Sequence, residues 1–101
     1  MDSSITALHN EVVAAVSDAL ETPATAMVVG GRWHAAVAVV RGVVFAAVLE
    51  LADEAGIDTD VDGRTGMTLV RVRYTESALP DTDGTVETMR NRALLFKEAL
   101  Q

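Results

Sequence analysis

Three carboxylates and a glycine in the segment DTDVDGRTG have the spacing of a cation-binding loop. Asp58, Asp60, Asp62 and Gly63 match positions 1, 3, 5 and 6 of the EF-hand calcium loop, in which alternate carboxylates converge on one ion. The match then ends, because position 12, which should supply a bidentate Glu, is Leu69, and the following residues have the pattern of a strand. We therefore expect a solvated acidic turn here, with Ca²⁺ binding as the alternative.

The remaining reactive residue types form no catalytic constellation. His9 and His34 are the two histidines, and neither lies at the spacing of a zinc protease motif. The serines lack a Gly-x-Ser-x-Gly context, and no Lys-Ser/Thr follows Gly30 and Gly31, as a phosphate loop would require. The chain has no cysteine, hence no thiolate nucleophile and no disulfide. The sequence predicts a protein that is not an enzyme and has no catalytic residues or bound cofactor.

Arg41 interrupts the long apolar stretch HAAVAVVRGVVFAAVLEL, residues 34–51. An arginine at mid-bilayer costs on the order of 2.5 kcal/mol or more, which argues against a membrane span. A charge among apolar neighbours must be paired or must reach the surface. Arg41 is expected either to extend to water or to an acid of the first helix, or to cross a subunit interface.

Two structures are consistent with this middle third. In the first, one helix runs from about Arg32 to Ala55; in the second, Gly30 and Gly31 form a hairpin turn between TAMVV and RWHAAVAVV, and a helix begins near Gly42. Length and alanine content favour the single helix. Such a helix would be apolar on every face until Glu50, so it must be a central helix wrapped by the others or one shared between subunits.

The flanking segments have clearer periodicities. Apolar residues three and four apart predict helices over 4–21 and 85–100, and alternation over about 67–75 predicts a short strand or hairpin before the second of these. The fold class expected is therefore mainly α: a small helical bundle around one long apolar central helix. Its 101 residues are expected to form a single domain, 1–101.

Charge and composition limit the possible partners. Fifteen acidic and eight basic residues give a net charge of −7, which disfavours direct nucleic-acid binding through the phosphate backbone. An acidic surface suits concentrated salt and indicates a halophilic source, although a GC-rich genome would produce a similar composition. The acid-bearing start MDSSITALHNE does not have the basic character of a secretory signal, and no targeting motif follows it.

The small size of the apolar side chains predicts self-association. Alanine and valine bury little area each, so a monomer built from them is expected to be marginally stable, and a homo-oligomer would relieve that. An acidic first helix and a basic strand could meet head to tail between neighbours, which closes rings. The candidate interface residues are Trp33, Arg41, Arg71, Arg73, Met89, Phe96 and Leu100.

In size, acidity and order of expected elements, the whole chain resembles the head-tail connector (adaptor) proteins of tailed viruses, here of a halophilic host. The resemblance implies a virion protein, assembled in the host cytoplasm, that is mostly helical and forms a ring beneath the portal. Its terminal helix TVETMRNRALLFKEALQ would contact portal or neck components. A tail-completion protein of the same neck fits nearly as well. The alternative from another class is a small cytosolic regulatory or cation-binding module that uses the Asp58–Asp62 loop.

Overall fold

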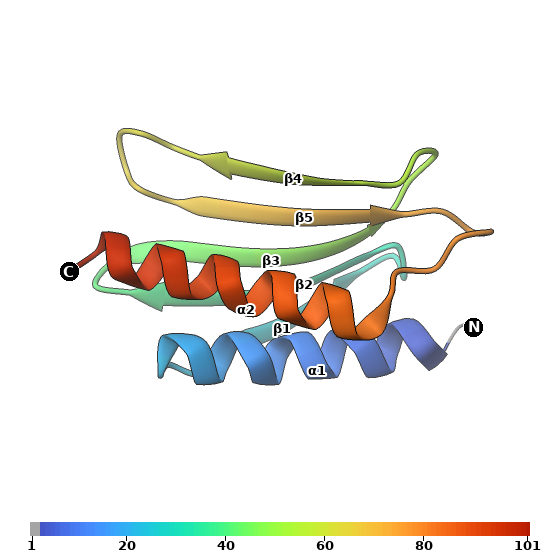
Figure 1. The fold of residues 1–101 in the computed structure, drawn as a ribbon, viewed down its shortest axis with the longest axis horizontal. Coiled ribbons are helices and arrows are strands. Elements are labelled where there is room, and N and C mark those ends of the chain that lie inside the picture. The colour runs from blue at the N-terminus through green and yellow to red at the C-terminus, as the bar shows by residue number, and fades with distance from the viewer. Residues whose placement is uncertain (1–2) are drawn as a thin grey trace.

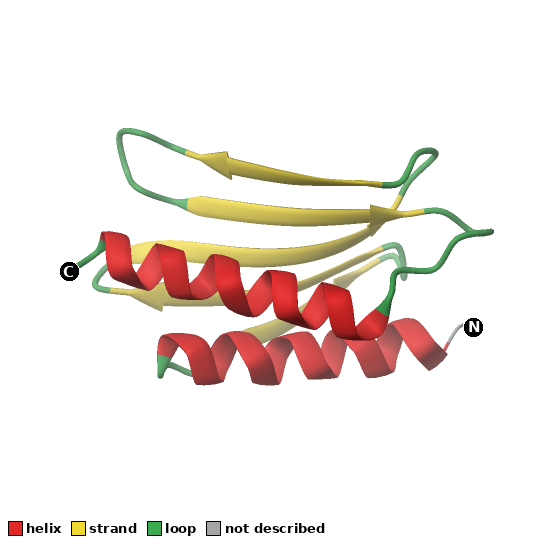
Figure 2. Cartoon of the chain, in the orientation of Figure 1, coloured by secondary structure: helices red, strands yellow, loops and turns green. Residues whose placement is uncertain are grey.

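A computed structural model describes residues 3–101 as two layers, a pair of helices lying along one face of a five-stranded sheet (Figure 1). The elements follow one another along the chain as α1 (Ser3–Leu20), β1 (Thr25–Val29), β2 (Trp33–Val40), β3 (Val43–Leu51), β4 (Gly56–Val61), β5 (Thr68–Tyr74) and α2 (Thr82–Ala99). Both helices cover the same face, so within residues 3–101 the opposite face of the sheet has no helix over it (Figure 2).

The sheet is mixed, with strand order β1-β2-β3-β5-β4. Strands β1, β2 and β3 form an antiparallel meander. After β3 the chain passes to the outer edge as β4 and returns as β5, which pairs antiparallel with β4 and parallel with β3. The first strand and the fourth are therefore the two edges.

The expectation of a mainly α fold is wrong, because the proposed central helix is the β2–β3 hairpin. Arg41 and Gly42 form its two-residue turn, with φ angles of 53° and 77°, the signature of a turn with positive φ at both central positions. Apolar residues occupy both faces of these strands, so the period-two alternation that marks a strand is hidden. Helix propensity is a weak prior, and here strand pairing overrides the preference of the many alanines for a helix.

The hairpin alternative is correct in its first half and wrong in its second. Gly30 and Gly31 lie between the paired strands β1 and β2, but the residues after Gly42 form β3, with no helix. The acidic segment expected as a loop supplies β4 over Gly56–Val61. The strand expected at about 67–75 is confirmed as β5, and the two flanking helices are confirmed with ends shifted by a few residues.

The core lies between the helix layer and the sheet. Alternate residues of the central strands face the helices, and Phe45 packs against Phe96 of α2 with ring centroids 5.3 Å apart. Asp81 caps the N-terminus of α2: its side chain accepts a hydrogen bond from the Gly84 N–H. Near its other end, Lys97 forms an ion pair with Glu21, which follows α1. Neither described helix is apolar enough over its length to cross a membrane.

Candidate functional site

The face of the sheet opposite the two helices, called the open face below, has no covering layer within residues 3–101. Strand pairing places side chains on it in rows: Met27, Ala35, Val48, Arg71 and Asp58 form one row from β1 to β4. The neighbouring rows contain Val29, Trp33, Glu50 and Arg73, then Thr25, Val37, Ala46, Leu69 and Asp60, and finally Val39 with Val44. The open face is thus mostly apolar over β1–β3, apart from Thr25 and Glu50, and mostly charged over β4–β5, apart from Leu69.

Part of the apolar half is covered by its own larger side chains. Trp33, Val37 and Leu69 pack onto a small cluster formed by Ala35, Ala46 and Val48, and this keeps Val48 fully buried. The outer apolar residues have no such cover. Met27, Val29 and Val39 are 44%, 59% and 55% exposed. Met27 and Val29 are neighbours on one side of β1, and Val39 lies further along β2, beyond the half-buried Val37. Apolar residues gathered on one exposed face mark an interaction site more often than scattered ones do.

The charged half holds its cations between acids. Arg71 lies 3.9 Å from a Glu50 carboxylate oxygen and 3.7 Å from one of Asp60, and Arg73 Nε lies 3.0 Å from Asp58. A side chain at Gly56 would collide with the Arg73 guanidinium, which therefore lies against the end of β4. Charges of both signs alternate across this half, so it presents no patch of a single sign.

The three candidate calcium ligands do not converge. Asp58 and Asp60 project from β4 toward the two arginines of β5. Asp62 lies past the end of the strand, where its carboxylate accepts hydrogen bonds from the N–H groups of Arg64 and Thr65. These hydrogen bonds stabilise the ionised carboxylate and hold the pKa of Asp62 below its usual value, and the bond from Arg64 has the larger effect. The acidic segment thus combines a strand with a capped turn, and each carboxylate has a protein partner.

The candidate interface residues fall into three places. Trp33, Arg71 and Arg73 lie on the open face. Arg41, in the β2–β3 turn, donates a hydrogen bond from Nη1 to the Leu100 carbonyl, 2.9 Å away, and so ties the hairpin to the end of α2. The other three belong to the chain's own core: Met89 and Phe96 are buried, and Leu100 packs against them half-buried.

Two features of the open face and its surroundings escaped the sequence analysis. The favoured single helix from about Arg32 to Ala55 places Val39 on a helix and leaves Met27 and Val29 outside it, so their common face could not be recognised. The histidines were considered separately, although His9 and His34 are in contact, with ring centroids 5.2 Å apart. The Gly30–Gly31 pair indicates a hairpin, and strands on both sides of it would have placed Met27, Val29 and Val39 on one face of a sheet.

Comparison with known proteins yields no relative. No family model matches the chain, and neither a curated protein nor a solved structure matches it. The function of the protein must therefore follow from its own residues.

Proposed function

We propose that this protein is a non-catalytic interaction protein that self-associates through the open face of its sheet. The observation that supports the proposal is the apolar half of that face, where Met27 and Val29 on β1 and Val39 near the other end of β2 are exposed with no helix above them. The other face of the same sheet is covered by α1 and α2 over β1, β2, β3 and β5. A second layer over the open face would bury the apolar residues in the same way.

The area available is that of a small interface. The five strands hold 5, 8, 9, 6 and 7 residues. With a rise of about 3.3 Å per residue and about 4.8 Å between strands, they cover roughly 550 Å². Two copies packed face to face would bury about 1,100 Å² in total, just below the usual range for stable specific interfaces. We therefore expect a weak dimer, with a dissociation constant of about 1 μM or higher.

A second copy of the chain is the occupant that fits both halves. A two-fold axis lying between the sheets and crossing the strands places β1–β3 of one copy over β1–β3 of the other, apolar on apolar. The charged half offers no single-sign patch that would attract a basic or an acidic partner, because Arg71 and Arg73 are each held by acids of the same chain. Apolar contact, rather than charge, would then drive the association.

Salt dependence separates this mechanism from association by charge. Each copy has a net charge of −7, so two copies repel each other at low ionic strength. Raising salt from about 0.1 M to about 2 M screens that repulsion, and apolar association should tighten. An interface held by ion pairs would weaken over the same range.

The experiment is analytical ultracentrifugation over a concentration series, with the fluorescence of the single tryptophan as a second signal. Trp33 lies half-buried on the open face, so its emission should shift to the blue as the dimer forms. The variant Val39→Glu places a charge in the interface and should weaken association by about 2–3 kcal/mol, or roughly 30- to 150-fold. Val61→Glu is the matched control. Val61 is 63% exposed on β4 but lies on the helix side of the sheet, so the dissociation constant of this variant's dimer should equal that of the wild type.

Two results would count against the proposal. A wild-type chain that remains monomeric at every concentration and salt would refute it, as would equal weakening by the two glutamate variants. The connector role suggested by the sequence requires a ring, so the same sedimentation data test it: a closed species of many subunits would support that role, and a dimer would argue against it. The element order behind that resemblance included the central helix, which the fold replaces with strands.

A further inference from the structure

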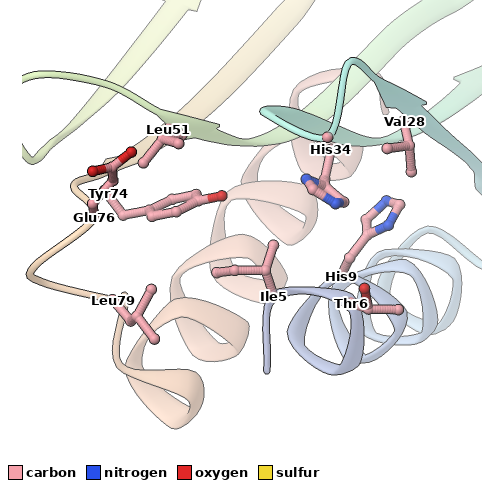
Figure 3. A pocket seen from close by; sticks show the side chains of 10 residues that line it. Ile5, Thr6, His9, Val28, His34, Leu51, Tyr74, Glu76 and Leu79 are labelled. Atoms are coloured by element: carbon pink, nitrogen blue, oxygen red, sulfur yellow. The ribbon is translucent and has the colours of Figure 1, made fainter. Parts of the chain in front are cut away.

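Strand β1 is an outer edge of the sheet, and within residues 3–101 its one strand neighbour is β2. Every residue of Thr25–Val29 is exposed, and Val28 is 57% exposed. Figure 3 shows Val28 on the helix side of the sheet, among the side chains that line a cavity beside α1. The helix layer therefore leaves β1 partly uncovered, and the outer edge of this strand is accessible.

Alternate residues of β1 direct their backbone N–H and C=O groups away from β2. The Val29 carbonyl accepts a hydrogen bond from the Arg32 N–H in the β1–β2 turn, so the backbone groups of Val29 face β2. Those of Met27, two residues earlier, face the same way, and those of Ala26 and Val28 face outward. Within residues 3–101, no backbone hydrogen bond outside the helices and strand pairs involves Ala26 or Val28. Unpaired groups in such a row can bind another strand.

The two edges of the sheet differ in their protection against a further strand. Natural edge strands usually contain a charge, a proline or a bulge, which blocks such pairing. Strand β4 contains Asp58 and Asp60. Strand β1 has the sequence TAMVV, without a charge or a proline, and its register with β2 is regular. Strand β1 is therefore the edge that can accept another strand.

We propose that β1 pairs antiparallel with β1 of a second copy and joins the two sheets into one. A two-fold axis through Met27, perpendicular to the sheet, places Ala26 of each copy opposite Val28 of the other. Residues opposed in this way exchange both N–H···O=C bonds, so the outward groups of both residues become paired. The joined sheet ends in two β4 strands, whose aspartates oppose further growth. This pairing uses the backbone edge and does not require the open-face dimer.

The area of the edge supports a second copy as the occupant. A five-residue strand is about 17 Å long, and a sheet with its helix layer is about 20 Å thick, so each copy buries at most roughly 330 Å². The edge alone thus gives a weak dimer. Together with the open face, it raises the buried area of each copy to about 900 Å², above the roughly 800 Å² of a standard interface. A tetramer that uses both surfaces rests on the proposed function, whereas the edge pairing itself does not.

A cysteine placed on the proposed axis tests the pairing, because the chain has no cysteine of its own. The two Met27 Cα atoms would be about 4.5 Å apart, within the range for a disulfide, and the two Val29 Cα atoms about 13 Å apart. Packed face to face, the sheets would be about 10 Å apart, too far for a disulfide at either position. Both side chains are exposed. With oxidised glutathione, Met27→Cys should form a linked dimer about tenfold faster than Val29→Cys.

Two further substitutions, each combined with Met27→Cys, show whether backbone pairing brings the copies together. Val28→Pro removes an outward N–H and leaves the pairing with β2 intact, so it should slow cross-linking by about tenfold. Val28→Thr keeps the N–H and should leave the rate unchanged. Val39→Glu, on the open face, should also leave it unchanged, which separates the edge from the proposed open-face dimer.

Faster cross-linking of Met27→Cys than of Val29→Cys supports the proposal even if Val28→Pro fails to fold. Equal rates in the two cysteine variants would overturn it and leave the edge to a strand of another protein. A folded Val28→Pro variant that cross-links as fast as Val28→Thr would overturn it as well. These outcomes are independent of the sedimentation of Val39→Glu and Val61→Glu, on which the proposed function depends.

Discussion

Replacing Gly42 with alanine adds one methyl group at a backbone position whose φ is +77°. Gly42 is the second residue of the β2–β3 turn, and Arg41 before it also has a positive φ. A Cβ atom built on Gly42 meets no other atom within 4 Å. The substitution therefore perturbs the backbone preference alone, without a steric clash.

The two structures considered for this segment give Gly42→Ala opposite signs. In the hairpin, an L-residue in the left-handed region costs about 1–2 kcal/mol, partly offset by about 0.4–1 kcal/mol because alanine restricts the unfolded chain. We expect a net loss of about 1 kcal/mol in the free energy of unfolding. In the interior of a helix, the same change would stabilise the protein by about 1 kcal/mol.

Urea unfolding followed by far-ultraviolet circular dichroism measures this difference, at fixed protein concentration because self-association would add to stability. Gly63→Ala is the control, since Gly63 also has open space around its Cβ position but no positive φ. It should leave stability unchanged or raise it by a few tenths of a kcal/mol. A Gly42→Ala variant more stable than the wild type would refute the hairpin and the fold built on it.

Three further predictions follow from the core, from His34 and from the acidic segment. Phe45→Ala should lower the free energy of unfolding by about 3–5 kcal/mol in the same urea assay, because it leaves a void against Phe96 at the centre of the core. The pKa of His34 is lower in the folded chain than in the unfolded chain, so the unfolded chain binds a proton at a higher pH. The free energy of unfolding should therefore fall as the pH drops below about 6.5. Thermal unfolding followed across pH should show a smaller fall for His34→Phe. Calcium at millimolar concentration should not raise the melting temperature above that in magnesium at equal ionic strength, because the carboxylates of residues 58–62 are already paired within the chain. A rise specific to calcium would instead support the predicted calcium site.

The sequence predicted the elements whose two sides differ in polarity. Strand β5 alternates buried Val70, Val72 and Tyr74 with arginines, and α1 has an apolar stripe, so both were found with nearly correct bounds. Strands β2 and β3 are apolar on both faces, since one side meets the helices and the other forms the open face. Periodicity carries no information in such a segment, and alanine content then favoured the wrong element.

The open face could not be predicted from the sequence, because β2 and β3 were expected to form one helix. Trp33 was named as a contact residue, and it does lie on the open face, but the valines and methionine around it are brought together only by strand pairing. The contact between His9 and His34 joins a helix to a strand 25 residues further along, and no local pattern encodes it. Long-range neighbours of this kind follow from the topology, which had to be known first.

The helix layer is made from the two ends of the described chain: α1 at residues 3–20 and α2 at residues 82–99 lie side by side over the same sheet (Figure 1). On the ribosome, α1 and all five strands emerge before α2, and chains generally fold as units from the N-terminal side. Until α2 is released, Phe45 and its neighbours face water on one side of the nascent sheet while the open face is bare on the other. Newly made chains should therefore depend on rapid completion of synthesis, or on a holding chaperone, to escape aggregation through either surface.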